Sequence, residues 1–299
     1  MKNLIIYFYN INPKSIRYGK SGYFFSDEYN DYILREGTRK KEEIYELIDL
    51  TDYLRQFGVY LHEFVVNNFG DVYSFINTKY YVLLKIIKKE SRRIDISDIN
   101  DLTRLEIKKK YSYITRNSWK KFWSENMDYI ESILTEYQYV DGNILAYIDY
   151  NIGLVENAIQ LLDEVGNKGN SVCHIRVNKK MKAIDFYDPC NIVLDSKSRD
   201  YCEYYCDSIE ENNMVLEDIV FKNLDVIEQK LFFIRMLYNT KFFDALSLFE
   251  DQYQSDRKSM AKYKKIINYI SEYENKIKLL YNEYFEKLLP KIEWLKKAS

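Results

Sequence analysis

The fold of this chain is decided by one stretch near its middle, residues 171–205, which reads SVCHIRVNKKMKAIDFYDPCNIVLDSKSRDYCEYY. The stretch carries His174, which is one of only two histidines, a close series of aspartates and the pair Arg199-Asp200. Segments whose apolar residues recur at helical spacing lie before and after it. We therefore expect a central loop segment enclosed by helices.

The composition is that of a globular protein, with 46% apolar and 30% charged residues over 299 positions. The 44 basic and 46 acidic residues argue against a general nucleic-acid binder, because phosphate contacts need a basic excess. No segment is apolar enough to span a membrane, and the apolar start at 1–14 is predicted to be a first strand. The four cysteines fit a reducing compartment, so the sequence predicts a cytoplasmic protein.

Residues 1–88 are predicted to form a β-rich N-terminal lobe, because runs of aromatic and branched residues alternate with turn residues. The predicted elements are strands at 16–25 and 30–35, a helix at 41–57, and a meander of strands at 62–67, 72–76 and 80–87. The helix shows apolar residues on one face and ends at Gly58, which is typical of a left-handed C-terminal cap.

Residues 89–299 are predicted to form a helical C-terminal lobe that contains the central segment 171–205. The charged string KKESRR at 88–93 marks the boundary between the lobes. The predicted helices are at 97–116, 119–137, 149–165, 228–249 and 259–289. The expected fold class is therefore α+β, with a small antiparallel sheet and one helix in the first lobe.

Three strings resemble the spore-coat-associated CotS-type group of the aminoglycoside-phosphotransferase-like kinases. The group's hairpin leading into the hinge is similar to NNFGDVYSFINTKYYVLLKIIK at 67–88. Its Trp-containing helix resembles WKKFWSENMDYIESI at 119–133, and its Arg-Asp-Leu-Ala segment resembles SRDYCEYY at 198–205. The resemblance implies a two-lobed protein-kinase-like fold.

The resemblance also implies chemical parts that this sequence lacks. Such kinases use a third-strand lysine, a His-Gly-Asp base, and an asparagine and an aspartate that hold magnesium. Arg35 stands at the position of the lysine, and Met181 at that of the asparagine. His174 and Arg176 occupy the degenerate catalytic-loop position, where a guanidinium cannot accept a proton at neutral pH. No residue is therefore predicted to be catalytic, and Arg35 and Lys85 are the candidate cofactor contacts.

Two aspartates are candidate metal ligands by their spacing. Asp188 lies twelve residues before Asp200, and Asp195 lies nineteen residues after Arg176, each of which matches one of the family's spacings. Asp185 lies only nine residues after Arg176, which is too close for the usual hairpin. The alternative interpretation is that these aspartates cap turns and helices, as aspartates commonly do.

The predicted function is that of a catalytically degenerate kinase-like protein, a pseudokinase of the spore-coat group. The resemblance implies a bacterial protein of the mother cell or spore coat, with a structural or interaction role in sporulation and other coat proteins as partners. The first alternative is an active ATP-dependent phosphotransferase for a small hydroxylated or amino substrate, and only that alternative requires ATP and magnesium. The second is a helical cytoplasmic binding module unrelated to kinases.

Overall fold

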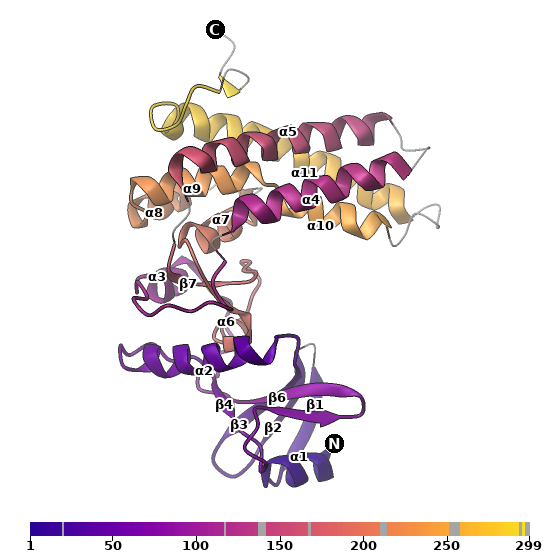
Figure 1. Cartoon of the computed structure of the whole chain (residues 1–299), viewed down its shortest axis with the longest axis vertical. Helices are drawn as coiled ribbons and strands as arrows, with labels where there is room; N and C mark the ends of the chain where they lie inside the picture. The colour runs from indigo at the N-terminus through magenta and orange to yellow at the C-terminus, as the bar shows by residue number, and fades with distance from the viewer. Residues whose placement is uncertain are drawn as a thin grey trace. The chain divides into compact units, whose positions relative to one another are not determined.

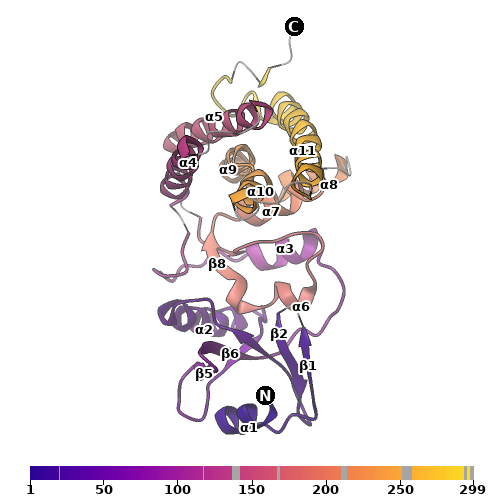
Figure 2. The ribbon, with the colours of Figure 1, turned by 90° about the vertical axis from the view of Figure 1, so that its right-hand side faces the viewer.

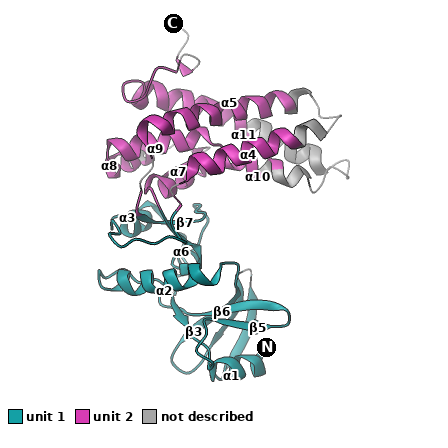
Figure 3. Ribbon diagram, in the orientation of Figure 1, with its two compact units in different colours: residues 1–115, 171–194 teal, residues 116–170, 195–299 magenta. Residues whose placement is uncertain are grey.

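The computed structural model describes residues 1–19, 21–116, 118–136, 142–166, 169–209, 214–250, 258–292 and 295–296. It divides into two compact units, which Figure 3 colours separately. Unit 1 comprises residues 1–115 and 171–194, and unit 2 comprises residues 116–170 and 195–299. Unit 1 therefore extends past the predicted boundary at residue 88 and includes most of the central segment.

Unit 1 is built on an antiparallel sheet in the order β1-β2-β3-β6-β4, with β5 also paired to β6. Its strands are β1 (Ser15–Gly19), β2 (Gly22–Ser26), β3 (Asp31–Glu36), β4 (Glu63–Val65), β5 (Tyr73–Ile76) and β6 (Lys79–Lys85). The strands β4 and β5 pair with successive parts of β6, so the predicted meander is wrong in its pairing. The turn at 67–71 between β4 and β5 is held by the Asn67 side chain, which accepts the Phe69 and Asp71 N–H groups.

The predicted first strand is in fact the helix α1 (Lys2–Tyr9). Ile5 and Tyr9, one helical turn apart, are buried against Phe25, Leu34 and Leu83 of the sheet. A short apolar run fits either a strand or a helix, and here packing of the i, i+4 face onto the sheet decides the outcome. The N-terminal part of unit 1 therefore carries two helices, α1 and α2 (Lys41–Arg55), where one was predicted.

The predicted helix at 97–116 is shorter than expected, because α3 covers only Ile96–Thr103. Beyond it, the Glu46 carboxylate of α2 accepts the backbone N–H groups of Ser112, Tyr113 and Ile114 at 2.8–3.0 Å. These three N–H groups therefore donate to a side chain and not to the carbonyl groups of a helix.

The rest of unit 1 comes from the central segment. It contains the short strands β7 (Ser171–His174) and β8 (Ile192–Asp195), which pair with each other, the helix α6 (Ala183–Phe186) and a 3-10 turn at Pro189–Asn191. The last residue of β8 lies in unit 2. Figure 1 labels these elements along the chain.

Unit 2 is a helical bundle. Its helices are α4 (Trp119–Glu136), α5 (Gly142–Val165), α7 (Ser198–Cys206), α8 (Met214–Asn223), α9 (Val226–Leu237), α10 (Thr240–Glu250) and α11 (Lys258–Leu280), which continues into a π turn at Tyr281–Phe285. Every residue from Leu231 to Leu237 is buried, so α9 is the central helix. Figure 2 looks along the bundle and shows α9 inside the ring of α4, α5 and α11.

The predicted helix at 228–249 is two helices, because the chain leaves helical geometry at Tyr238. The Asn239 side chain then accepts the Phe242 N–H at 3.2 Å and caps α10. The other predicted helices of unit 2 are present, with shifted ends. None of the helices in the described residues is long and apolar enough to cross a membrane.

Candidate functional site

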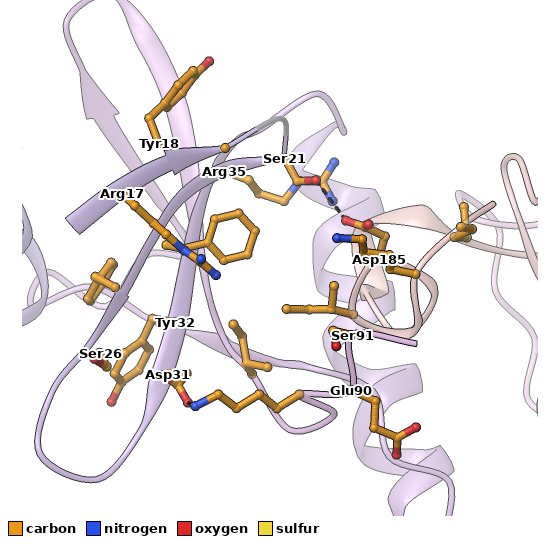
Figure 4. A pocket seen from close by; sticks show the side chains of 18 of the residues that line it. Arg17, Tyr18, Ser21, Ser26, Asp31, Tyr32, Arg35, Glu90, Ser91 and Asp185 are labelled. Carbon is orange, nitrogen blue, oxygen red and sulfur yellow. Dashed lines mark hydrogen bonds and ion pairs between the residues drawn. The ribbon is translucent and has the colours of Figure 1, made fainter. Parts of the chain in front are cut away.

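Unit 1 contains a cavity of about 1340 Å³. Its walls come from β1, β2 and β3, from the segment after β6, and from the segment around α6 (Figure 4). The lining residues are Ser15, Arg17, Tyr18, Gly19, Ser21, Phe24, Phe25, Ser26, Asp31, Tyr32, Arg35, Ile86, Lys89, Glu90, Ser91, Asn178, Lys180, Met181, Lys182, Ile184, Asp185 and Asn191. The cavity therefore combines an apolar wall with many charged side chains.

The turn between β1 and β2 contacts the opposite wall. The Ser21 hydroxyl donates to Asp185 Oδ1 at 2.9 Å, and the dashed line in Figure 4 marks this bond. Gly22 makes the turn possible, since its φ is +138° and a Cβ there would lie 2.4 Å from the Leu34 carbonyl oxygen. The bond to Asp185 thus depends on a glycine at position 22.

Arg35 on β3 lines the cavity and forms a close ion pair with Asp188. The Asp188 carboxylate is only 5% exposed, and its Oδ1 accepts the Cys190 N–H at 2.8 Å. Burial lowers the pKa of Arg35, but the neighbouring Asp188 carboxylate raises it more, and the net shift is upward. Arg35 therefore keeps its charge and is already paired with Asp188 inside the protein.

His62 joins the segment after β6 to α6. Its Nδ1 accepts the Ile87 N–H at 3.2 Å, so its Nε2 carries the proton and donates to the Ile184 carbonyl at 2.8 Å. Burial lowers the pKa of His62, which keeps the ring neutral. The histidine thus fixes two walls of the cavity relative to each other.

His174, at the end of β7, lies in the core next to α6. Its ring contacts Phe186 with centroids 4.1 Å apart, and its Nε2 is 2.8 Å from the Phe186 carbonyl oxygen. The side chain is fully buried, whereas the next two residues, Ile175 and Arg176, are exposed. His174 therefore has a structural environment and does not line the cavity.

Asp195 lies in unit 2, where it is fully buried. Its Oδ2 accepts the Trp119 indole N–H at 2.9 Å and an Arg199 N–H at 2.8 Å, while its Oδ1 accepts the Ser196 N–H at 2.8 Å. Burial lowers the pKa of Arg199, but the carboxylates of Glu203 and Asp195 raise it more. Asp195 therefore joins the start of α7 to α4 by hydrogen bonds.

Lys85 occupies the end of β6, opposite Tyr32 of β3. Its ammonium is 4.0 Å from a Glu63 carboxylate oxygen, and it is not among the residues that line the cavity. Of the two predicted cofactor contacts, the structure therefore places Arg35 in the cavity wall and Lys85 outside it.

The comparison with protein families agrees with this architecture. The family model described as "Spore coat putative kinase YutH" matches residues 2–280. This chain belongs to the YutH family. A search of curated proteins gives no match to its sequence.

Solved kinase-like structures share the fold of this YutH-family chain. An aminoglycoside phosphotransferase from Alicyclobacillus acidocaldarius superposes with a TM-score of 0.63 and 8% identity, covering 92% of this chain and 93% of that one. The amicoumacin kinase hAmiN gives 0.60 and 13%, with 92% of each chain covered. A microcompartment-associated aminopropanol kinase gives 0.59 and 14%, covering 96% and 97%.

At these identities the likeness shows the fold alone. It confirms the predicted two-lobed kinase-like α+β class, since an antiparallel sheet precedes a mainly helical remainder. The interpretation as a helical module unrelated to kinases is wrong, because unit 1 carries the sheet of the kinase fold.

A kinase-like fold implies magnesium, and the two predicted metal ligands of this YutH-family chain, Asp188 and Asp195, are already hydrogen-bonded within the protein. Magnesium prefers free carboxylate and phosphate oxygens at near-octahedral positions. Both oxygens of Asp188 and both of Asp195 already accept N–H groups, as described above. Among the described residues, no group of three or more His, Cys, Asp or Glu side chains is arranged to hold a metal ion.

The sequence reasoning missed the carboxylate that does line the cavity, Asp185. Its spacing to Arg176 had excluded it, because the expected hairpin needs more residues. Within residues 169–209, all of which the structure describes, no such hairpin precedes Asp185, and the segment from Ile175 to Lys182 runs directly to α6. The Asp185-Phe186 string, similar to the usual metal-site sequence, was the signal that should have identified it.

Proposed function

We propose that this YutH-family protein is a non-catalytic kinase-like protein with a structural or interaction role in the spore coat. The observation that carries the proposal is the charge of the segment after β7. Residues 174–184, HIRVNKKMKAI, contain four basic residues and no carboxylate. Phosphoryl transfer in kinases relies on an aspartate there to orient the substrate hydroxyl and accept its proton.

The acidic residues elsewhere in the cavity do not supply a replacement. Asp31 is paired with Lys89 at 2.6 Å, and Glu90 is paired with Arg92 at 2.7 Å. Asp185 accepts the Ser21 hydroxyl. Each of these three carboxylates therefore already has an ion-pair or hydrogen-bond donor within the protein.

One observation favours the alternative, an active phosphotransferase for a small hydroxylated or amino substrate. Asp185 lines the cavity, and among the described residues only its Oδ1 accepts a hydrogen bond. In an active kinase the other oxygen would coordinate a magnesium ion bound to the nucleotide phosphates. The proposal and this alternative differ in one measurable property, which is turnover.

The test is transfer of labelled phosphate from ATP, with magnesium, to a panel of small alcohols and amines. We expect no product above the level of a heat-denatured sample, while an aminoglycoside phosphotransferase in the same assay gives product. Product that forms with this protein and disappears on Asp185→Asn would overturn the proposal and establish the alternative.

The structural role is tested in a spore-forming host by replacing the gene. We expect loss of the gene to change the protein composition of the coat, and the Asp185→Asn variant to restore it as well as the unmodified gene does. A variant that is present at normal abundance yet fails to restore the coat would contradict a non-catalytic role.

A further inference from the structure

We propose that a basic surface of unit 1 binds an extended polypeptide segment rich in glutamate or aspartate, supplied by another protein. The basic surface consists of residues 88–93 and 176–182. This inference rests on the proposed function and deepens it, since it names the surface and the partner class of a protein with an interaction role.

Two basic strings that are far apart in the sequence lie side by side in this surface. They are KKESRR at 88–93 and RVNKKMK at 176–182, which together hold eight basic residues and one acidic residue. The Ile94 N–H donates to the Met181 carbonyl at 3.0 Å, and the Ala183 N–H donates to the Arg92 carbonyl at 3.0 Å. These two bonds hold the strings antiparallel, so the backbone brings their basic residues together.

The two residues opposite each other between these bonds are Arg93 and Lys182. Because the hydrogen bonds come from the flanking residues, the two form a non-hydrogen-bonded pair, the kind in which the side chains lie closer together. Like charges directly opposite each other destabilise an antiparallel pairing. Both side chains are exposed, and in the part of the chain that the structure describes neither has a carboxylate oxygen within 4.0 Å of its nitrogen atoms. An anion bound between the two would remove the repulsion.

The acidic side chains beside this repulsive pair already have other partners. Arg92 binds both Glu90 and Asp98, at 2.7 Å in each case. Asp185 accepts the Ser21 hydroxyl at 2.9 Å. None of these carboxylates therefore supplies the counter-charge of the repulsive pair.

A third exposed cation, Lys180, lies two residues before Lys182. Among the described residues it also has no carboxylate oxygen within 4.0 Å of its ammonium. In an extended polypeptide, side chains on one face recur about 6.7 Å apart, so several carboxylates can contact cations that are spread along two strings. Clusters of basic residues recognise acidic polypeptide motifs in this way.

The composition of the surface favours a polypeptide over a nucleic acid. Single-stranded nucleic acids bind in basic grooves where aromatic side chains stack on the bases, and neither string contains an aromatic residue. The formal net charge of the chain is −2 although these strings are strongly basic, so the rest of the chain carries a negative excess. A short acidic segment that contacts only the basic surface avoids repulsion by that excess.

The experiment measures the binding of a fluorescein-labelled deca-glutamate peptide to the full-length protein by fluorescence anisotropy. We expect saturable binding in about 50 mM salt and weaker binding in about 200 mM salt, because salt screens exposed charges. No binding of the peptide at the lower salt concentration would overturn the inference. Tighter binding of decathymidylate than of the peptide would overturn it as well, since it would assign the surface to nucleic acid.

The variants Arg93→Gln and Lys182→Gln should each weaken peptide binding by about fivefold, from the loss of one partly screened charge pair. Each should also raise the melting temperature of the protein without peptide by about 2 °C, because each removes the like-charge repulsion. Lys2→Gln is the matched control, since it removes the charge of an exposed lysine on α1. The sheet lies between α1 and α6, and α6 directly follows Lys182 (Figures 1 and 2).

Unchanged peptide affinity in Arg93→Gln would overturn the inference. Arg93 does not line the cavity, so binding that depended on Lys182 alone would belong to the cavity and not to the surface. An equal loss of affinity in Lys2→Gln would contradict it too, because the attraction would then be a property of the whole protein. A dimer that Arg93→Gln dissociates in sedimentation would assign the surface to a second copy of this chain. These results differ from a failure of the proposed function, which is detected by phosphate transfer and by the composition of the coat.

Discussion

The ion pair between Arg35 and Asp188 should behave as a stabilising pair and not as an open ligand site. Arg35→Met leaves the Asp188 carboxylate with one hydrogen bond, from Cys190, at a position where the side chain is 5% exposed. Breaking a buried pair by removing one partner costs about 3–5 kcal/mol. Because one hydrogen bond remains, we expect about 3 kcal/mol, or a fall of roughly 10 °C in the melting temperature of unit 1.

A double-mutant cycle separates this pair from general damage. Asp188→Asn exposes Arg35 to a cavity in which its side chain is already 17% exposed, so we expect the smaller loss of about 1–2 kcal/mol. Arg35→Met combined with Asp188→Asn removes the uncompensated charge, and the double variant should be more stable than Arg35→Met alone.

The assay is urea unfolding followed by circular dichroism, with hydrogen exchange of β3 to localise the change to unit 1. An Arg35→Met protein as stable as the unmodified one would refute the reasoning, because it would mean that the two charges are not paired. Strictly additive losses in the double variant would refute it equally, since a pair must show coupling.

Three further outcomes follow from single positions. Burial lowers the pKa of His62 below the value of about 6.5 in an unfolded chain. The contribution of neutral His62 to stability is therefore full above about pH 6.5 and is lost as the pH falls through the folded pKa. In urea unfolding across this range, the free energy of unfolding of His62→Gln should depend less steeply on pH than that of the unmodified protein. Gly22→Ala should cost more than about 1 kcal/mol in thermal unfolding, and more than Gly70→Ala, whose added Cβ meets nothing within 4 Å. Asp195→Ala should cost about 3–5 kcal/mol, because Arg199 loses a buried carboxylate partner and the Trp119 and Ser196 N–H groups lose their acceptor, while Asp195→Asn keeps an acceptor and should cost less.

Each of these has a contrary result. An unchanged pH slope in His62→Gln would assign the acid sensitivity to carboxylates. Equal losses at the two glycines would mean that the close approach at Gly22 is relieved by movement of the strand. An Asp195→Ala protein as stable as the unmodified one would mean that this carboxylate does not hold the start of α7 to α4.

The periodic parts of the fold were predictable from the sequence, and the reason is visible in their side chains. In α2, Ile44, Leu47 and Leu54 recur at helical spacing, and all three are buried. In β6, Val82, Leu83 and Leu84 form the apolar centre of a strand that pairs on both of its edges. Local pattern and tertiary packing agree at these positions, so sequence reasoning succeeds there.

The failures occur where a distant side chain decides the backbone. No sequence feature near residue 112 indicates that the backbone N–H groups of residues 112–114 donate to Glu46 and not to the carbonyl groups of the predicted helix. Likewise, the N-terminal run becomes helical only because Ile5 and Tyr9 find a sheet surface to cover. These interactions link positions far apart in the chain, and composition or periodicity does not encode them.

The sequence likewise predicts some features of the candidate site and not others. The family resemblance identifies Arg35 as a candidate cofactor contact and spacing identifies Asp188 as a candidate metal ligand, but neither shows whether the two side chains contact each other. The structure shows that they satisfy each other. Asp185 was rejected because a family hairpin was assumed, and the absence of that hairpin among the described residues is a property of the whole connection between β7 and β8.

The pair of Arg35 and Asp188 limits what position 35 can contribute to a ligand. A basic residue on the third strand of a kinase must be available to phosphate, whereas Arg35 is paired with a carboxylate that is only 5% exposed. A ligand that took Arg35 would leave the Asp188 carboxylate buried without its charged partner, which costs about 3–5 kcal/mol. Arg35 therefore contributes to the stability of unit 1 more than to the charge that the cavity offers.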